Sequence, residues 1–191
     1  MAPRVTRPLK GNVDVVIRPA RPADVDALLA LENAVFESDR LERRSFRHAV
    51  RSPTISLLVA ETAKGIAGYA MILRRRGSAT AHLGSIAVAP AVSGVGVGTS
   101  LLTASEFEAA SHDGARLRLE VREDNAVAQK LYEGMGYHRI ERIDDYYQDG
   151  AAAWRYEKEI PKRGGRRAAL HRQRKVKAPR ARDGRRRTRE P

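Results

Sequence analysis

The sequence predicts a single α/β domain, a mixed and twisted sheet of about seven strands flanked by helices. A length of 191 residues suits one domain with a sizeable core. Strand-like and helix-like patterns alternate along the chain, and a glycine-rich junction links a strand, a helix and a second strand into a βαβ unit. We expect a flexible segment over 1–12, the domain over 13–161 and a disordered tail over 162–191.

The first elements are a strand followed by two helices. Val13 to Ile17 reads as a strand, and Ala23 to Glu37 carries apolar residues at helical spacing. Asp39 is suited to cap a second helix that runs through about Val50. Ser52-Pro53 then ends that helix, because the residue before a proline avoids helical geometry.

A meander leads from there to the glycine-rich junction. Ile55 to Glu61 and Ile66 to Arg74 form a hairpin around Lys64-Gly65. Ala81 to Val88 is the strand that enters the junction, and Thr99 to Ala110 is the helix that leaves it.

The remaining elements complete the sheet. Ala115 to Val121 returns as a strand parallel to the one before the junction, and its alternation places Leu117, Leu119 and Val121 on one face. Asn125 to Glu133 is a helix. Two strands, Tyr137 to Ile143 and Trp154 to Glu159, close the fold as an antiparallel pair around Asp149-Gly150.

The junction itself predicts an anion-binding site. Gly94, Gly96 and Gly98 alternate where an apolar strand turns into a helix. Glycines let a backbone approach a ligand closely, and the first turn of a helix offers amides without internal partners. We therefore expect a phosphate-bearing ligand here.

Two known phosphate-binding motifs can be compared with the junction, and a turn without a ligand is an alternative to both. A P-loop would need a lysine after the last glycine, where Thr99 stands. A dinucleotide fold fits Gly94, Gly96 and an acid at Glu120, but Gly98 comes one residue too early for its third glycine. A glycine-rich turn that binds nothing remains the third alternative.

Composition excludes several kinds of chemistry. The chain has no cysteine, which removes disulfides, thiolate metal sites and an acyl-cysteine intermediate. Its body histidines, His48, His82, His112 and His138, lack metal-ligand spacing, so we expect them to be solvated and expect no metal. No stretch approaches the length of a membrane span, which predicts a cytoplasmic protein with no membrane partner.

The net charge of +13 is concentrated at the C-terminus. Residues 162–191 hold fourteen Lys and Arg against two acids, which leaves the body nearly neutral. Such a segment buries too little apolar surface to order itself. It suits contact with ribosomal or other nucleic acid through phosphates, and a solvated tail is the alternative.

A second motif gives a family resemblance. Leu119 to Tyr137 reads LEVR-x-x-N-x-x-A-x-x-LY-x-x-x-G-Y, and a Tyr146-Tyr147 pair follows. With the glycine junction, this stretch resembles the GNAT superfamily of N-acetyltransferases, closest to its ribosomal-protein alanine N-acetyltransferase (RimI-like) subfamily, from about Val15 to Ile160. Ser93 departs from the family pattern, which has Arg or Gln there, and we expect weaker cofactor affinity as a result.

The resemblance implies acetyl coenzyme A as cosubstrate and a parallel strand pair that splays at its site. The pyrophosphate would lie on the amides of the junction, and the pantetheine arm would run along the preceding strand. The Val88 amide would stabilise the oxyanion formed in acyl transfer. The residues so implicated are Ile86, Ala87, Val88, Ser93, Gly94, Val95, Gly96, Val97, Gly98, Thr99 and Asn125.

Two catalytic roles follow from the resemblance, each with a structural alternative. Glu120 matches the general base, acting through water, but it could instead be a surface charge paired with an arginine. Tyr132 matches the acid that protonates the departing thiolate, but it could simply pack its helix against the sheet. Asn125 is expected both to cap its helix and to meet the cofactor.

The acceptor is expected to be a protein α-amine that attacks the thioester directly. A lysine or small amine is the alternative, as is a module that binds acetyl coenzyme A or nucleic acid without turnover. The sequence leaves the oligomer open between monomer and dimer. Candidate acceptor contacts are Phe36, Glu37, Ser38, Asp39, Tyr146 and Tyr147.

Overall fold

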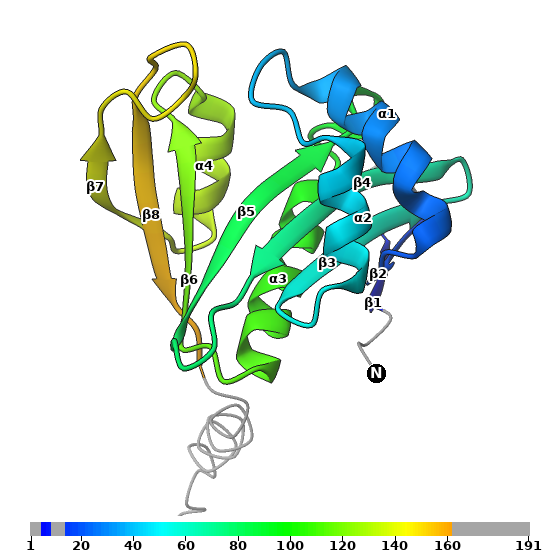
Figure 1. The fold of residues 1–191 in the computed structure, drawn as a ribbon, viewed down its shortest axis with the longest axis horizontal. Coiled ribbons are helices and arrows are strands. Elements are labelled where there is room, and N and C mark those ends of the chain that lie inside the picture. The colour runs from blue at the N-terminus through cyan, green and yellow to red at the C-terminus, as the bar shows by residue number, and fades with distance from the viewer. Residues whose placement is uncertain (1–4, 9–13, 162–191) are drawn as a thin grey trace, which may run out of the picture.

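A computed structural model describes residues 5–8 and 14–161 of the chain, and their strands form one eight-stranded sheet (Figure 1). The strand order is β1-β2-β3-β4-β5-β6-β8-β7. All neighbours run antiparallel except β5 and β6, which are parallel as expected. The strands are β1 (Val5–Pro8), β2 (Asp14–Pro19), β3 (Ile55–Thr62), β4 (Gly65–Leu73), β5 (Thr80–Val88), β6 (Arg116–Arg122), β7 (His138–Ile143) and β8 (Ala153–Glu159).

The predicted fold class is confirmed, with one strand more than the seven expected. The additional strand is β1, which falls in the segment that the sequence left without structure and pairs with β2. The expectation for the basic tail concerns residues 162–191, which lie outside the described part of the chain.

Helices cover both faces of the sheet (Figure 1). On one face lie α1 (Val25–Val35), which follows a short 3₁₀ turn over Pro22–Asp24, and α2 (Arg43–Arg51). On the other face lie α3 (Val97–Ser111) and α4 (Ala126–Gly134). No helix among the residues that the structure describes is both long and apolar enough to span a bilayer.

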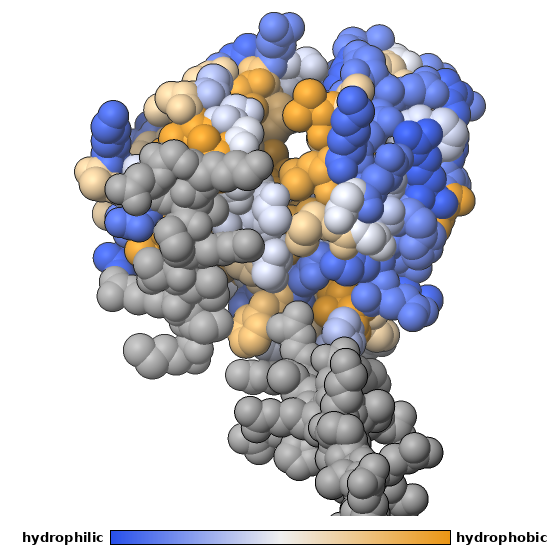
Figure 2. Space-filling view, turned by 180° about the vertical axis from the view of Figure 1, so that it is seen from behind, coloured by the Kyte–Doolittle hydropathy of each residue, from blue (hydrophilic) through white to orange (hydrophobic). Residues whose placement is uncertain are grey.

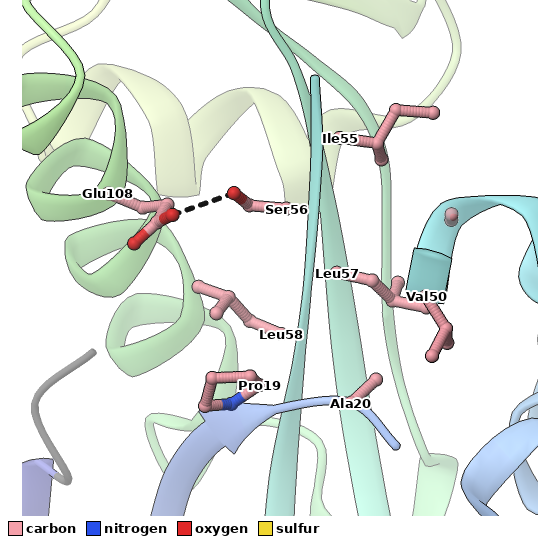
Figure 3. Close-up of a pocket in the computed structure, with 9 residues that line it drawn as sticks. Pro19, Ala20, Val50, Ile55, Ser56, Leu57, Leu58 and Glu108 are labelled. Carbon is pink, nitrogen blue, oxygen red and sulfur yellow. Dashed lines mark hydrogen bonds between the residues drawn. The ribbon is translucent and has the colours of Figure 1, made fainter. Parts of the chain in front are cut away.

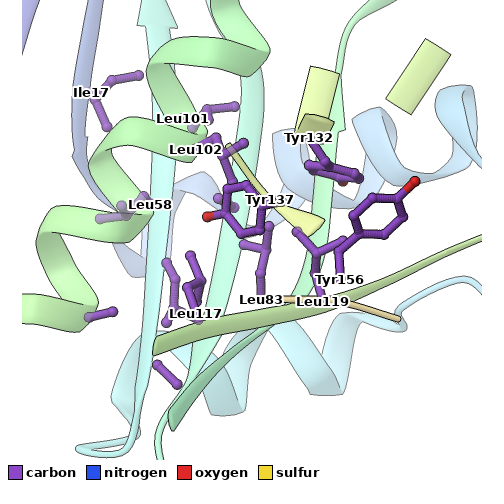
Figure 4. Close-up of a cluster of buried hydrophobic side chains, with 14 of the residues drawn as sticks. Ile17, Leu58, Leu83, Leu101, Leu102, Leu117, Leu119, Tyr132, Tyr137 and Tyr156 are labelled. Carbon is purple, nitrogen blue, oxygen red and sulfur yellow. The ribbon is translucent and has the colours of Figure 1, made fainter. Parts of the chain in front are cut away.

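The larger of two cores packs under α3 and α4 (Figure 4). The alternation predicted for β6 is confirmed there, since Leu117, Leu119 and Val121 are all buried. The second core lies under α1 and α2, where Phe46 meets Tyr69 edge to face with ring centroids 5.4 Å apart.

The capping role expected for Asp39 is wrong. α2 begins only at Arg43, with Glu42 at its N-cap position. Asp39 adopts a positive φ of 52°, and its Oδ1 accepts a hydrogen bond from the Gln148 amide at 3.3 Å. The Asp39 carboxylate, which the local sequence predicts to cap a helix, therefore binds the β7–β8 loop instead.

The parallel pair β5–β6 parts midway along its length. The strands pair only from Thr80 with Arg116 to Leu83 with Leu119. Beyond that point β5 continues with β4, whereas β6 continues with β8 (Figure 1). A register shift in the β4–β5 ladder coincides with the divergence and leaves Gly84 without a partner on β4.

A separate small groove lies where β2 ends and the edge of β3 is uncovered (Figure 3). Pro19, Ala20 and Val50 are among its lining residues, and the Ser56 hydroxyl donates to Glu108 at 2.7 Å. None of the predicted site residues lines this groove.

Candidate active site

The glycine junction presents a continuous row of free amides. Gly94 and Gly96 have φ angles of 77° and 107°, which L side chains rarely adopt, and Gly96 is the N-cap of α3. Within the described chain, the six amides from Gly94 to Thr99 donate no hydrogen bond. The helix dipole adds a partial positive charge at the same place. The loop is therefore suited to hold an anionic group.

The third glycine serves packing. Gly98 lies inside α3, and a Cβ added there would come within 3.3 Å of Leu131 in α4. Val97 is buried, so only its main chain is available to a ligand. Ser93 is exposed, and its amide donates to the Pro90 carbonyl at 3.1 Å.

At the end of β5, main-chain groups that pair with no residue in 5–8 or 14–161 face the parted strands. The Ala89 amide donates to Ala67 of the β4 side at 2.8 Å. In an antiparallel pair, successive residues point their main-chain N–H and C=O groups alternately toward and away from the partner strand. The groups of Ile86 and Val88 therefore point away from β4, toward the side from which β6 has diverged. Ala87 between them faces β4 with its main chain and the second core with its side chain.

An opening is visible in the surface where these strands diverge. Figure 2, seen from behind, shows it bordered by apolar side chains. An extended ligand placed there could pair with the free groups of β5 as an additional strand would.

Glu120 is the first residue of β6 beyond the paired region. Only 6% of its side chain is exposed, and Oε1 accepts a hydrogen bond from Arg155 Nε at 2.7 Å. Its Oε2 is bonded to His82 Nε2. Burial raises the pKa of Glu120, but the hydrogen bonds with His82 and Arg155 lower it by more. The carboxylate therefore stays charged at pH values at which an ordinary glutamate would begin to be protonated.

His82 is partly solvated, with 39% of its side chain exposed, but it also has a partner that the sequence did not indicate. It projects from β5 across the start of the divergence and binds Glu120. The partner Arg155 comes from β8, which pairs with the opposite edge of β6. Local residue spacing predicts neither the His82 contact nor the Arg155 contact with Glu120, because both depend on the register of strands that lie far apart in sequence.

Tyr132 is buried among aromatic side chains, which fits the packing role that the sequence offered as an alternative. The residue is 4% exposed and packs with ring centroids 6.0 Å from Tyr137 and 6.0 Å from Tyr156 (Figure 4). Burial raises the pKa of its hydroxyl, and nearby Tyr147 raises it further. The phenol is therefore protonated at neutral pH.

Three predicted acceptor residues gather around Glu120. Tyr146 and Tyr147 stand edge to face with centroids 5.0 Å apart, and Asp39 is tied to the same loop. Burial raises the pKa of Tyr147 to about 12, and Tyr146, Glu120 and Asp39 act in the same direction. Burial and the charge of Glu120 also raise the pKa of Tyr146. Two carboxylates and two phenols thus lie close to one another.

The other acceptor candidates lie on the connection between α1 and α2. Phe36 packs partly against the second core, whereas Glu37 and Ser38 are exposed. On the cofactor side, Asn125 caps α4 as expected, its Oδ1 accepting from the Ala128 amide at 3.0 Å.

The arrangement is that of a protein that binds an extended, phosphate-bearing ligand between parted parallel strands. A family model described as "Acetyltransferase (GNAT) domain" matches residues 21–160. The chain belongs to the GNAT family of N-acetyltransferases, and the resemblance read from the sequence is confirmed.

Individual similar proteins cover about three quarters of this chain. A protein of Mycobacterium leprae is 35% identical over 144 residues, which are 74% of this chain and 39% of that protein, so the chain spans well under half of its length. The N-alpha-acetyltransferase of Sulfurisphaera tokodaii is 28% identical over 149 residues, 72% of this chain and 89% of that one. The crystal structure of the ribosomal-protein-S18-alanine N-acetyltransferase from Escherichia coli superposes with a TM-score of 0.68 at 25% identity, covering 76% of this chain and 94% of that one.

Proposed function

We propose that the protein transfers the acetyl group of acetyl coenzyme A to the α-amino group of a protein N-terminus. The observation that carries this is the row of six free amides, Gly94 to Thr99, leading directly to the unpaired groups of Ile86 and Val88. A pyrophosphate followed by an extended pantetheine arm needs those two features in that order. The bound cosubstrate would supply an activated thioester.

Groups of the protein itself are proposed to stabilise the negative charge that develops during acetyl transfer. The Val88 N–H points into the gap and is suited to stabilise the oxyanion formed when the amine attacks the thioester carbonyl. The C–N bond would form first and give this oxyanion. The C–S bond would break when the carbonyl re-forms, one proton would leave the amine, and one would be taken up by the departing thiolate. We propose that Tyr132, which burial keeps protonated, gives the second proton.

The ionisation of the acceptor favours an α-amine over a lysine. At pH 7 an amine with a pKa of about 7.7 to 8.0 costs about 1 to 1.4 kcal/mol to deprotonate, whereas lysine, near 10.4, costs about 4.6 kcal/mol. Glu120 has a lowered pKa and is a weak base, so it suits the smaller task, acting through water. Its charge and that of Asp39 also attract the ammonium form before the proton leaves.

The relatives support a protein acceptor, since two of them are named for N-alpha and ribosomal-protein alanine acetylation. A lysine or small amine is the alternative acceptor, and a non-catalytic acetyl coenzyme A or nucleic-acid-binding module is the alternative class. We propose a cytoplasmic location, a monomer or dimer, and no metal.

The test is incubation with labelled acetyl coenzyme A and a peptide library that varies the first residues, read by intact mass. Blocking the N-terminus of the best peptide while leaving an internal lysine free should abolish transfer. Transfer that survives the block would show a lysine acetyltransferase, and binding of coenzyme A without transfer to any peptide would show a non-catalytic module.

The composition of residues 162–191 favours a second activity, contact with ribosomal RNA or other nucleic acid, although that segment lies outside the described structure. Its test replaces the run Arg185-Arg186-Arg187 with glutamine in the full chain and measures RNA affinity across a salt series. We expect a smaller salt slope, by about 0.7 to 0.9 for each phosphate that the variant no longer neutralises. A slope equal to that of the wild type would exclude this role for the three arginines.

A further inference from the structure

A buried carboxylate outside the catalytic groups links the two substrate sites. Glu32 of α1 is 1% exposed, and its Oε1 accepts a hydrogen bond from the Leu41 amide at 2.7 Å. Its Oε2 accepts from the hydroxyl of Tyr69 in β4, which is fully buried. That hydroxyl lies 2.7 Å from the Ser85 hydroxyl in β5. A single chain of contacts therefore joins α1, β4 and the divergent part of β5.

Glu32 also holds both ends of the connection that carries the acceptor candidates. Its main-chain carbonyl accepts from the Phe36 amide at 3.0 Å, and its carboxylate accepts from Leu41. Residues 36–41 are thus closed into a loop by one residue. Asp39, at the middle of that loop, is held from the other side by the Gln148 amide.

The hydrogen bonds along this chain have a defined direction. Tyr69 donates its hydroxyl proton to Glu32, which leaves the Tyr69 oxygen to accept from Ser85. The polar groups of the Glu32, Tyr69 and Ser85 side chains then all have partners, and Glu32 and Tyr69 are buried away from water. If Ser85 moved, the buried hydroxyl oxygen of Tyr69 would lose its hydrogen-bond donor. Because an unpaired buried polar atom costs free energy, Tyr69 and Glu32 should move with Ser85.

Ser85 lies at the place where such a shift is expected. It falls two residues after the last β5 residue paired with β6, and it directly precedes Ile86. A ligand that pairs with the free groups of Ile86 and Val88 acts on the segment that holds Ser85.

We propose that Glu32, Tyr69 and Ser85 form a positioning chain that couples occupation of the β5 gap to the conformation of the acceptor loop 36–41. The proposal rests on the proposed function in taking that gap as the acetyl coenzyme A site. Acetyl coenzyme A then orders the acceptor loop, and by reciprocity the acceptor peptide tightens acetyl coenzyme A.

Hydrogen exchange measures this coupling without any reaction. We expect acetyl coenzyme A to slow exchange in the 36–42 segment of the full-length wild type about 5-fold or more. Tyr69→Phe and Ser85→Ala should still bind acetyl coenzyme A but lose that protection. The matched control is Tyr156→Phe, which removes another buried phenol, one bonded to Arg139 at 2.6 Å, and should keep the protection.

Equal protection in wild type and Tyr69→Phe would overturn the proposal, as would its loss in Tyr156→Phe. Thermal unfolding identifies any variant that fails to fold, and Ser85→Ala, the smallest change, then carries the test. If the wild type binds no acetyl coenzyme A, the proposed function fails as well. Binding without protection of the loop refutes only the coupling.

Substitution of Glu32 separates positioning from a general loss of stability. In Glu32→Gln the amide oxygen can still accept from Leu41 while the amide nitrogen donates to Tyr69, so the chain persists with its direction reversed. Glu32→Ala breaks it. We expect the acceptor KM to rise about 10-fold in Glu32→Ala and to recover in Glu32→Gln, with the acetyl coenzyme A KM changed less in both. Equal acceptor KM values in the two variants would count against the proposal.

Discussion

The sharpest prediction concerns the charge of Glu120. Glu120→Gln keeps the size of the side chain and one oxygen to accept from Arg155, but it removes the negative charge that, in the proposed function, acts on the acceptor amine. The lowered pKa of Glu120 means that the carboxylate is fully ionised from about pH 6 to 9. In that range the enzyme's rate should therefore follow the titration of the acceptor α-amine, near 7.7 to 8.0, and not that of Glu120.

The size of the effect follows from the same reasoning. General bases contribute about 10² to 10⁴ in rate, and a weak base acting through water belongs at the lower end. We expect the plateau of kcat/KM to fall about 100-fold, equivalent to about 2.7 kcal/mol, with its pH midpoint unchanged. The assay is thiol release with an α-amine peptide from about pH 5.5 to 9.5, a range that brackets the titration of the amine.

Glu141→Gln is the matched control for this prediction. Glu141 binds the other side of Arg155 and is half exposed, so its removal disturbs the arginine without touching the gap. We expect a change of less than about 3-fold, well below the effect expected of a catalytic base. A plateau unaffected by Glu120→Gln would refute the assigned role, and a shifted midpoint would show that Glu120 itself titrates in this range.

Further predictions test the scaffold and the anion site. Arg18 is 6% exposed, and its hydrogen bonds lower the pKa of Asp24. The Arg18–Asp24 pair therefore stabilises the fold at pH values above the ordinary pKa of a carboxyl group, and this stabilisation is lost as the pH falls through the lowered pKa of Asp24. Urea unfolding should therefore show Arg18→Met destabilised by about 2 to 3 kcal/mol at pH 7, with the difference shrinking below about pH 3. Gly96→Ala should cost about 1 to 2 kcal/mol at its φ of 107° and weaken acetyl coenzyme A in calorimetry, whereas Gly134→Ala, in open space on a helix, should be neutral or stabilising. Ser93→Arg should tighten acetyl coenzyme A several-fold at low salt, and a Kd unchanged by it would show that backbone amides alone hold the pyrophosphate.

Patterns that are local in sequence predict most of the fold. The alternation of β6 indicates its buried face, and the order of strand, glycines, helix and strand indicates the parallel pair. Asn125 can be recognised as a cap because an N-cap is defined within four residues. The position of Glu120 at the divergence follows from the family motif, since the strand pattern says nothing about where two strands part.

The contacts that tune the site are beyond the reach of such patterns. His82 and Arg155 meet Glu120 across two strand pairings, 38 and 35 residues away in sequence. Nothing local distinguishes Glu32 from other polar residues of a helix, because its partner Tyr69 lies 37 residues further on. Asp39 has the local pattern of a cap, yet its partner Gln148 is 109 residues away. A short polar side chain prefers local partners until tertiary structure supplies another.

The divergence of β5 and β6 would explain why the proposed cosubstrate site, catalytic groups and positioning chain all fall at one place. A strand that leaves its neighbour exposes N–H and C=O groups, and leaving them unpaired in an apolar setting is costly. A ligand that pairs with Ile86 and Val88 relieves that cost, so affinity arises from the same broken ladder that opens the gap. Glu120 can face this gap only because β6 has turned away at Leu119. Closing the sheet there would satisfy the backbone but leave no space for an extended cosubstrate.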